Sequence, residues 1–341
     1  MDTPPIQALT QEEIDHTHRS HRMLKRIVGI LFAALIFMGG AIGVMAYLSA
    51  QTPPPPIPRI DARILQAQAI AAAFTPVSIE AKSAIVYDLA SGLSLYEKTA
   101  DVQLPLASLT KVPLALAINE VIPPYTELTI SRDIPPTSTL TQLKKGSRWR
   151  SQDLVDLTLV ASSNDGAQIL AAAADDPLRV RYPAAPLGAA AVYRMNILVQ
   201  GLGLTHTYFV NPTGLDETTD QSGAYGTARD IAKLFAYAAT SAPDLFVATT
   251  RPLLTITSAD GEQATAKNTD HALSDIPGLI MGKTGYTDLA GGNLAIVFTP
   301  EGGRVLAAVV LGSSEQGRFD DMRTLIAAAQ KALAVASSTP H

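Results

Sequence analysis

Leu106-Ala107-Ser108-Leu109-Thr110-Lys111 decides how the rest of the chain is interpreted, because it places a serine three residues before a lysine at the start of an apolar helical run. Side chains at positions i and i+3 are neighbours on a helix, so the Ser108 hydroxyl is expected beside the Lys111 amine. A serine hydroxyl is a poor nucleophile at neutral pH unless a base takes its proton. A lysine whose pKa is lowered by burial and by nearby cations can be that base. The segment therefore predicts a nucleophile, Ser108, and its base, Lys111.

Two further motifs follow in an order that would complete such a site, Ser162-Ser163-Asn164 and Lys283-Thr284-Gly285. The Asn164 amide can orient both Lys111 and a substrate amide, and the Ser162 hydroxyl can relay a proton to a leaving amine. Each short motif taken singly arises by chance in many proteins. Their joint order, with the second in a helical region and the third at the end of an apolar strand, predicts one site for acyl transfer.

The third motif is expected to bind the substrate. The positive charge of Lys283 suits a substrate with a free carboxylate, and it also helps to hold Lys111 neutral, because two nearby cations disfavour one another. Thr284 adds a hydroxyl donor for the same carboxylate. Gly285 lets a substrate backbone lie against the strand without a side chain in the way.

Backbone groups are expected to complete the site. The N–H groups of Ser108 and Tyr286 are the natural donors of an oxyanion hole, which stabilises the negative charge that develops during acyl transfer. The plainer interpretation of these motifs is structural, with Ser108 as a helix N-cap and with Ser162 and Asn164 in a turn between helices. The joint order of the motifs favours the catalytic interpretation.

The motifs and the blocks around them resemble those of the serine DD-peptidases, the low-molecular-mass penicillin-binding proteins of the D-alanyl-D-alanine carboxypeptidase type. The resemblance runs from about Ser83 to Leu325, and its blocks are Leu106–Lys111 (LASLTK), Asn211–Asp216 (NPTGLD), Ala224–Asp230 (AYGTARD) and Met281–Thr287 (MGKTGYT). It implies a fold like that of penicillin-binding proteins and β-lactamases. It also implies peptidoglycan stem peptides as substrate, release of terminal D-Ala through an acyl-enzyme, and covalent inhibition by β-lactams. Neither a metal nor a cofactor is implied.

Three features depart from the family pattern. Pro113 falls five residues after Ser108, where a helix interior would lose a hydrogen bond, so the first turn after the nucleophile is expected to be irregular. Many family members have His at the position of Tyr286, although only the backbone is needed for the oxyanion. The arginine that binds the terminal carboxylate in some relatives has no evident match, since Ser313-Ser314 occupies that stretch and Arg318 is the nearest stand-in.

Composition excludes several other classes of function. The 341 residues are 47% hydrophobic, enough for a sizeable core, and the net charge of −5 leaves no basic face for nucleic acid. The absence of cysteine excludes disulfides, thiolate metal sites and cysteine nucleophiles. A Ser-His-Asp hydrolase is disfavoured, because no Gly-x-Ser-x-Gly stretch occurs. His206 and His271 lie in polar, turn-like surroundings, where a solvated histidine is expected.

Ile27–Leu48 reads IVGILFAALIFMGGAIGVMAYL, an uncharged stretch long enough to cross a bilayer as a helix. Basic residues precede it closely, so residues 1–26 are expected in the cytoplasm and everything after Leu48 outside it; they are Arg19, Arg22, Lys25 and Arg26. The alternative is a signal peptide cleaved after Ala46 or Ala50. The apolar region of a signal peptide usually spans about 7 to 15 residues, so length favours an uncleaved anchor in the lipid bilayer.

After the membrane segment we expect a proline-rich linker at 49–60, a catalytic domain at 61–336 and a short tail at 337–341. Residues 108–240 read as mainly helical. Helices are expected at Arg59–Phe74 and Arg318–Val335, and strands at Ser83–Asp88, Leu93–Glu97, Leu253–Thr257, Gly278–Thr284, Asn293–Thr299 and Val305–Leu311. This order predicts an α/β fold whose antiparallel sheet is built from both ends of the domain and flanked by helices, with a helical subdomain between them.

Three related functions share parts of this pattern. A class A β-lactamase needs a glutamate after the second motif to activate water for deacylation, and no Glu-x-x-Leu-Asn stretch occurs between Asn164 and Lys283. A penicillin sensor acylated without turnover needs a signalling domain, for which the roughly 26 residues before the membrane segment are too short. A DD-endopeptidase that cleaves peptide cross-links stays open, since the chain ends after its last helix, as single-domain relatives do.

Overall fold

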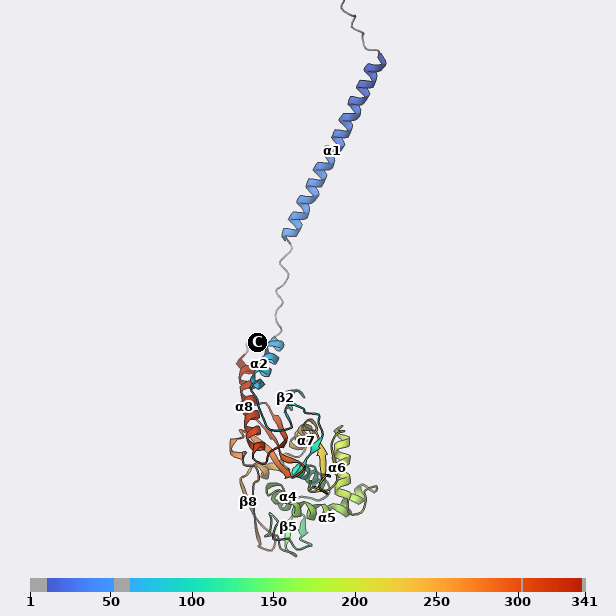
Figure 1. The fold of residues 1–341 in the computed structure, drawn as a ribbon. Coiled ribbons are helices and arrows are strands. Elements are labelled where there is room, and N and C mark those ends of the chain that lie inside the picture. Colours follow the sequence, from blue (N-terminus) through green and yellow to red (C-terminus); the bar gives the residue numbers. More distant parts are fainter. Residues whose placement is uncertain (1–10, 52–61, 302, 339–341) are drawn as a thin grey trace, which may run out of the picture. The chain divides into compact units, whose positions relative to one another are not determined.

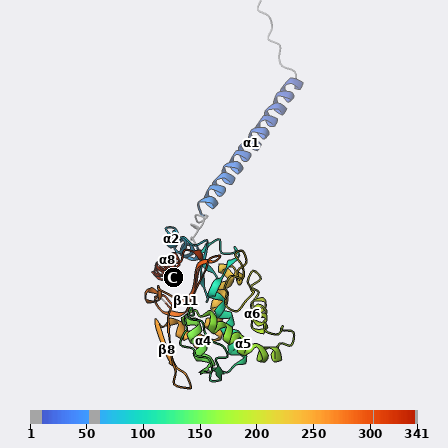
Figure 2. The same ribbon diagram turned by 60° about the horizontal axis from the view of Figure 1, so that its bottom comes forward.

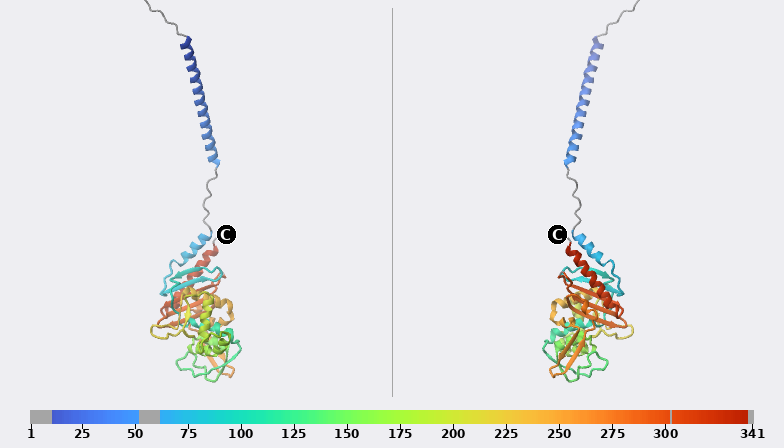
Figure 3. Two further views of the ribbon diagram at one scale, coloured as in Figure 1. Left: turned by 90° about the vertical axis from the view of Figure 1, so that its right-hand side faces the viewer. Right: turned by 90° about the vertical axis from the view of Figure 1, so that its left-hand side faces the viewer.

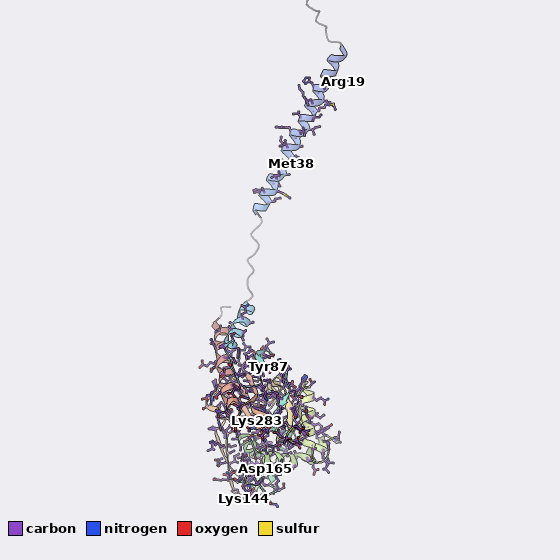
Figure 4. The ribbon with its side chains drawn as sticks, viewed as in Figure 1. Arg19, Met38, Tyr87, Lys144, Asp165 and Lys283 are labelled. Atoms are coloured by element: carbon purple, nitrogen blue, oxygen red, sulfur yellow. The ribbon has the colours of Figure 1, made fainter. Side chains whose placement is uncertain are left out.

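The computed structural model describes residues 11–51, 62–301 and 303–338. The chain divides into two compact units, residues 1–60 and 61–341. The described part of the first unit is one helix, α1 (Gln11–Gln51). Within it, the segment Arg19–Leu48 includes an 18-residue stretch with a mean hydropathy of 2.5 and no buried residues. This segment is long and apolar enough to cross a membrane, and it contains the predicted span Ile27–Leu48 (Figure 4, where Arg19 and Met38 are labelled). The predicted prolines of the linker, Pro53–Pro58, lie outside the described residues.

The second unit is built on a five-stranded antiparallel sheet in the order β10-β11-β12-β1-β2 (Figure 1). Its strands are β1 (Ser83–Asp88), β2 (Ser94–Lys98), β10 (Leu279–Thr287), β11 (Gly291–Phe298) and β12 (Leu306–Ser313). The first strand pairs with the last one, with Ser83 opposite Leu311. The prediction that both ends of the domain contribute to one antiparallel sheet is therefore confirmed.

Apolar residues cover both faces of this sheet. On one face lie α2 (Ala62–Phe74) and α8 (Gly317–Ser338), which run side by side (Figure 3, light blue and red). Strand residues facing them are Ala84, Val86, Leu294, Ile296, Phe298, Leu306, Ala308 and Val310. The alternate residues, such as Ile85, Val297 and Val309, face α7 (Ala228–Ser241). Since successive strand side chains point to opposite faces, a sheet buried on both sides requires the near-continuous apolar runs seen in β11 and β12.

The helical subdomain forms around α3 (Lys111–Val121), whose residues from Val112 to Ala115 are buried. Around it pack α4 (Ser151–Val160), α5 (Asn164–Arg181) and α6 (Ala190–Gly201), with α4 and α5 adjacent in Figure 2. The expected helical character of this region is confirmed. Short helical turns lie at η1 (Ala107–Thr110), η2 (Pro243–Thr250) and η3 (Leu273–Asp275).

Several short strands were not predicted. They are β3 (Leu104–Pro105), β4 (Glu127–Thr129), β5 (Arg148–Arg150), β6 (Tyr208–Phe209), β7 (Ala224–Gly226) and β9 (Gln263–Lys267). The last of these pairs with the predicted β8 (Leu253–Thr257) as an antiparallel hairpin. Its only apolar residues are two alanines, Ala264 and Ala266, so it lacks the β-branched and aromatic side chains by which a strand is recognised.

Candidate active site

Ser108 lies on the 3₁₀ turn η1, and Lys111 is the first residue of α3. Side chains at i and i+3 eclipse one another in a 3₁₀ turn, which places the Lys111 amine beside the Ser108 hydroxyl. Pro113 falls in the first turn of α3, where its missing N–H would have no partner within the helix. The expected loss of a hydrogen bond in a helix interior is therefore wrong, whereas the expected irregularity is real and takes the form of η1.

Lys111 is the best-defined group of the site. Its Nζ atom lies 2.7 Å from Ser108 Oγ, 2.8 Å from Asn164 Oδ1 and 2.8 Å from the carbonyl oxygen of Thr213. The side chain is 1% exposed. Burial lowers the pKa of Lys111 to about 7, because an ammonium group loses its hydration there. Near neutral pH a large share of the amine is thus unprotonated.

The geometry directs the lone pair of that neutral amine. A neutral lysine has two N–H bonds and one lone pair. The oxygens of Asn164 and Thr213 only accept hydrogen bonds, so they take the two N–H bonds. The lone pair is then left for the third neighbour, the hydroxyl of Ser108. This arrangement can withdraw the serine proton.

The second motif lies in a tight turn between α4 and α5. Ser163 caps α5 by accepting a hydrogen bond from the N–H of Gly166 at 3.1 Å, and Asn164 is the first residue of that helix. Ser162 has φ +54°, a left-handed conformation that costs a non-glycine residue about 1 to 3 kcal/mol. Ala107, the neighbour of Ser108, also has positive φ, at +49°. One strained residue, Ser162, is thus a candidate catalytic residue, and the other, Ala107, directly precedes Ser108.

The third motif lies within β10, which continues through Tyr286 to Thr287 instead of ending at Thr284 as predicted. Lys283 is 2% exposed, and its Nζ donates to Ser162 Oγ and to the carbonyl of Thr284, each at 2.8 Å. Figure 4 shows Lys283 inside the second unit. Burial holds the pKa of Lys283 well below its usual value, and the positive charges of Lys111 and Arg318 lower it further.

The expected role of Lys283 in keeping Lys111 neutral requires a correction. Burial is the cause of the lowered pKa of Lys111, whereas repulsion between the two amines lowers the pKa of Lys283. Because burial by itself accounts for the lowered pKa of Lys111, this residue does not need a charged neighbour to be neutral.

Gly285 has a role other than the expected one. A Cβ atom at this position would lie 2.9 Å from the carbonyl oxygen of Leu106 and 3.1 Å from the nitrogen of Ser108. The glycine thus lets β10 approach η1 closely. The Tyr286 side chain itself is 45% exposed.

Three residues of the site were missed from the sequence or given no role. The carbonyl of Thr213 contacts Lys111, and Asn211 shapes that loop by accepting hydrogen bonds from the N–H groups of Thr213 and Gly214 at 3.0 and 2.7 Å. Thr269 Oγ1 lies 2.5 Å from Thr284 Oγ1. The block Asn211–Asp216 was a signal for the first two, but no local pattern marks Thr269.

The remaining candidates lie outside the reacting cluster. Arg318 is 6% exposed and donates from Nη1 to the carbonyl of Gly285 at 2.8 Å. The His271 ring stacks on Phe319. A cavity of about 390 Å³ is bordered by Thr269 and Arg318, next to the third motif. A larger one, of about 590 Å³, lies around Asn119 at the far end of α3 and contains none of the motif residues.

Comparison with known proteins places these features in context. A family model described as D-alanyl-D-alanine carboxypeptidase matches residues 68–315. A Mycobacterium tuberculosis protein, D-alanyl-D-alanine carboxypeptidase DacB2, is 33% identical over 240 residues, which cover 70% of this chain and 77% of that protein. A Pseudomonas aeruginosa D-alanyl-D-alanine endopeptidase is 29% identical over 218 residues, or 61% of this chain and 64% of its own length.

Solved structures show the same likeness. Penicillin-binding protein D2 from Listeria monocytogenes, in its cefotaxime-bound form, superposes with a TM-score of 0.61 at 29% identity, covering 74% of this chain and 98% of that one. A D-alanyl-D-alanine carboxypeptidase from Mycobacterium tuberculosis gives a TM-score of 0.62 at 30% identity, covering 74% and 91%.

Proposed function

Because this chain belongs to the D-alanyl-D-alanine carboxypeptidase family and is a serine-type hydrolase of the penicillin-binding-protein fold, we propose that Ser108 is the residue that its substrate acylates. One observation carries this assignment. Lys111 donates its two N–H bonds to fixed carbonyl oxygens and has its third direction open toward Ser108 Oγ at 2.7 Å. A base held in this way can take the serine proton without rearrangement.

In the acylation step, Ser108 Oγ attacks the carbonyl carbon of the penultimate D-Ala of a stem peptide, and Lys111 takes the hydroxyl proton. The C–N bond then breaks, and the proton that Lys111 took passes through Ser162 to the leaving nitrogen. D-Ala departs as a neutral amine, and Lys111 is again unprotonated. Ser162 is suited to this relay because its Oγ lies 2.8 Å from Lys283 Nζ. The product is an ester on Ser108.

In the deacylation step, water attacks the ester carbon while Lys111 accepts one of its protons. The C–O bond to Ser108 breaks, and the serine oxygen takes that proton back. Both steps pass through a tetrahedral oxyanion. We assign its stabilisation to the N–H groups of Ser108 and Tyr286.

Lys283 and Thr284 are assigned to the terminal carboxylate of the substrate. An arriving carboxylate raises the pKa of Lys283 and so favours its charged form. Thr269 lies beside Thr284 and adds a second hydroxyl. The cavity of about 390 Å³ next to these residues provides room for the C-terminal end of the peptide.

The apolar helix α1 supports a single-pass membrane anchor. Its basic residues precede the apolar span, which favours a cytoplasmic N-terminus and a catalytic unit outside the cytoplasm. That compartment holds peptidoglycan, the substrate proposed here, and is where β-lactams would reach Ser108.

Labelling with a fluorescent penicillin followed by peptide mapping tests the assignment. The adduct is expected on the peptide that contains Ser108, and Ser108→Ala should abolish it, whereas Ser274→Ala, an exposed serine, should label as the parent does. Equal labelling of the Ser108→Ala variant would rule out the mechanism.

Incubation with defined muropeptides, read by mass spectrometry, tests the reaction. Loss of one terminal D-Ala from a pentapeptide stem is the expected result. Cleavage of cross-linked dimers at a higher rate would assign the chain to the endopeptidases, a function favoured by its likeness to the Pseudomonas aeruginosa protein. Acylation without any product would indicate a sensor.

A further inference from the structure

Arg318, the second residue of α8, is held in place from several sides. Its guanidinium lies 4.7 Å from the centre of the Phe319 ring and 5.9 Å from that of Tyr286. A Cβ atom on Gly292 would lie 3.2 Å from Arg318 Cδ, so the absence of a side chain there leaves room for the arginine. With 6% of its surface exposed, the side chain has little freedom to move.

The single hydrogen bond of Arg318 to the strand falls on a particular peptide unit. Its Nη1 donates to the carbonyl oxygen of Gly285 at 2.8 Å. That carbonyl and the N–H of Tyr286 are the two ends of one planar trans peptide, so they point in opposite directions. Arg318 therefore binds the peptide at its carbonyl end, and the Tyr286 N–H points away from Arg318.

The opposite side of this peptide is the nucleophile's side. β10 is an edge strand that pairs with β11 and also contacts η1. Tyr286 pairs with Gly292 of β11, which is the glycine that the Arg318 side chain passes. Gly285 approaches the nitrogen of Ser108, so the peptide that carries the Tyr286 N–H lies close to the other donor assigned to the oxyanion hole.

We propose that Arg318 is a positioning residue for the oxyanion hole, which fixes the plane of the Gly285–Tyr286 peptide and strengthens its N–H as a donor. This inference rests on the function proposed above. A hydrogen bond from a cation to a carbonyl is stronger than one between neutral groups, and hydrogen bonds in a chain polarise one another. The positive charge on Arg318 thus polarises the Gly285–Tyr286 peptide and strengthens the hydrogen bond that the Tyr286 N–H donates to the oxyanion. Arg318 does this without contact with the substrate.

Arg318 also borders the cavity of about 390 Å³ assigned to the C-terminal end of the peptide, so the experiment below must separate positioning from direct carboxylate binding. Its Nη1 is used by the backbone, and its Nε is buried with no hydrogen-bond partner among the described residues. A buried, unsatisfied donor costs stability, so a side chain placed this way stabilises the fold less than a fully bonded one would. We infer that the orientation that lets Nη1 bond to Gly285 leaves Nε without a partner.

The experiment compares Arg318→Lys and Arg318→Met with the parent, using the full-length chain in detergent. The control is Arg323→Ala, which removes an exposed arginine of the same helix that pairs with Asp275 and Asp320. Three quantities are measured: the rate of acylation by a penicillin, the kcat and KM for a D-Ala-D-Ala peptide, and the infrared frequency of the ¹³C-labelled ester carbonyl in the acyl-enzyme.

Loss of a whole oxyanion donor costs about 100- to 1000-fold in rate, so misaiming one is expected to cost Arg318→Met roughly tenfold in acylation rate and in kcat, with KM little changed. The ester carbonyl should shift to higher frequency, because it accepts a weaker hydrogen bond. Arg318→Lys keeps the charge and should recover part of both effects. Arg323→Ala should match the parent in all three.

Two results would overturn the inference. One is a rise in KM for the peptide with no effect on an ester that lacks the terminal carboxylate, which would make Arg318 a carboxylate ligand. The other is an unchanged carbonyl frequency in Arg318→Met, or in Arg318→Gln if the methionine variant fails to fold, which would leave only a structural role. If the parent itself is neither acylated nor active, the proposed function fails, and this inference fails with it.

Discussion

The carbonyl oxygen of Thr213 lies 2.8 Å from the Nζ atom of Lys111, although the two residues are 102 positions apart in the chain. This contact gives the amine its second fixed acceptor, after Asn164. A single acceptor would leave the lysine free to rotate its remaining N–H toward Ser108 and to turn the lone pair away. The Asn211–Asp216 loop thus helps to orient Lys111, the proposed base.

Gly214→Ala is expected to lower both stability and activity. The residue has φ +79°, and a Cβ atom there would overlap the carbonyl of Ala107, so the loop must move away from η1. Strain at positive φ alone costs about 1 to 3 kcal/mol. Gly146→Ala is a matched control, because Gly146 has φ +86° with open space around it.

Urea denaturation and D-Ala release would be measured on both variants. Gly146→Ala should lose stability but keep its kcat, whereas Gly214→Ala should lose both. Equal kcat values for the two would show that the contact between Gly214 and Ala107 does not position the site.

The acid limb of the activity profile should lie near pH 7. Burial lowers the pKa of Lys111 to about 7, and only the neutral amine accepts the Ser108 proton, so kcat/KM should rise as pH increases through this value. The measurement is the rate of acylation by a penicillin between pH 5 and 9. The carboxylate of the penicillin does not titrate in this range, so it does not contribute to the profile. A limb above pH 9 would mean that Lys111 keeps its ordinary pKa.

Lys111→Met should stabilise the folded chain while abolishing activity. The pKa of this lysine is about 7 in the fold and about 10.4 when unfolded, so between these values the unfolded state binds more protons. The parent therefore gains stability as pH rises from about 7 to about 10. The advantage of the methionine variant should be largest at pH 7 and below and should shrink toward pH 10, as read from thermal unfolding. A constant difference across this range would contradict the assigned shift.

Lys283→Gln should lower kcat/KM roughly tenfold to a hundredfold on a D-Ala-D-Ala peptide, because a charge-assisted hydrogen bond contributes about 1.5 to 3 kcal/mol. An ester without the terminal carboxylate should be affected far less. Lys283→Arg keeps the charge but changes its shape, so it separates the two contributions.

Lys144→Gln, which removes an exposed lysine paired with Glu262, serves as the control for these measurements. The acid limb should stay near pH 7 in Lys283→Gln, since burial alone accounts for the pKa of Lys111. If the variant affects both substrates equally, the carboxylate assignment of Lys283 is wrong.

The mature protein should retain α1. The intact mass of membrane-extracted protein should be that of a chain that still contains Ile27–Leu48 and the residues before it. The reason is that this apolar stretch exceeds the usual length in a signal peptide. A mature N-terminus near Gln51 would show that the segment is cleaved.

The sequence by itself determined the features that depend on local spacing. Ser108 and Lys111 are one turn apart, so any helical turn brings them together, and the alternating and continuous apolar runs of β1 and β11 predict strands of a buried sheet. The apolar length of Ile27–Leu48 predicts a membrane span for the same kind of reason, since hydrocarbon thickness sets the number of residues.

The tertiary structure alone decided the chemistry of those residues. The pKa of Lys111 depends on how completely other segments exclude water from it, and its orientation depends on Thr213, a residue distant in the chain. Thr269 and Arg318 reach β10 from separate elements, and no local pattern records which atom of a strand they will contact. Neighbours within one helical turn follow from backbone geometry, whereas burial and long-range hydrogen bonds exist only once the whole chain has packed.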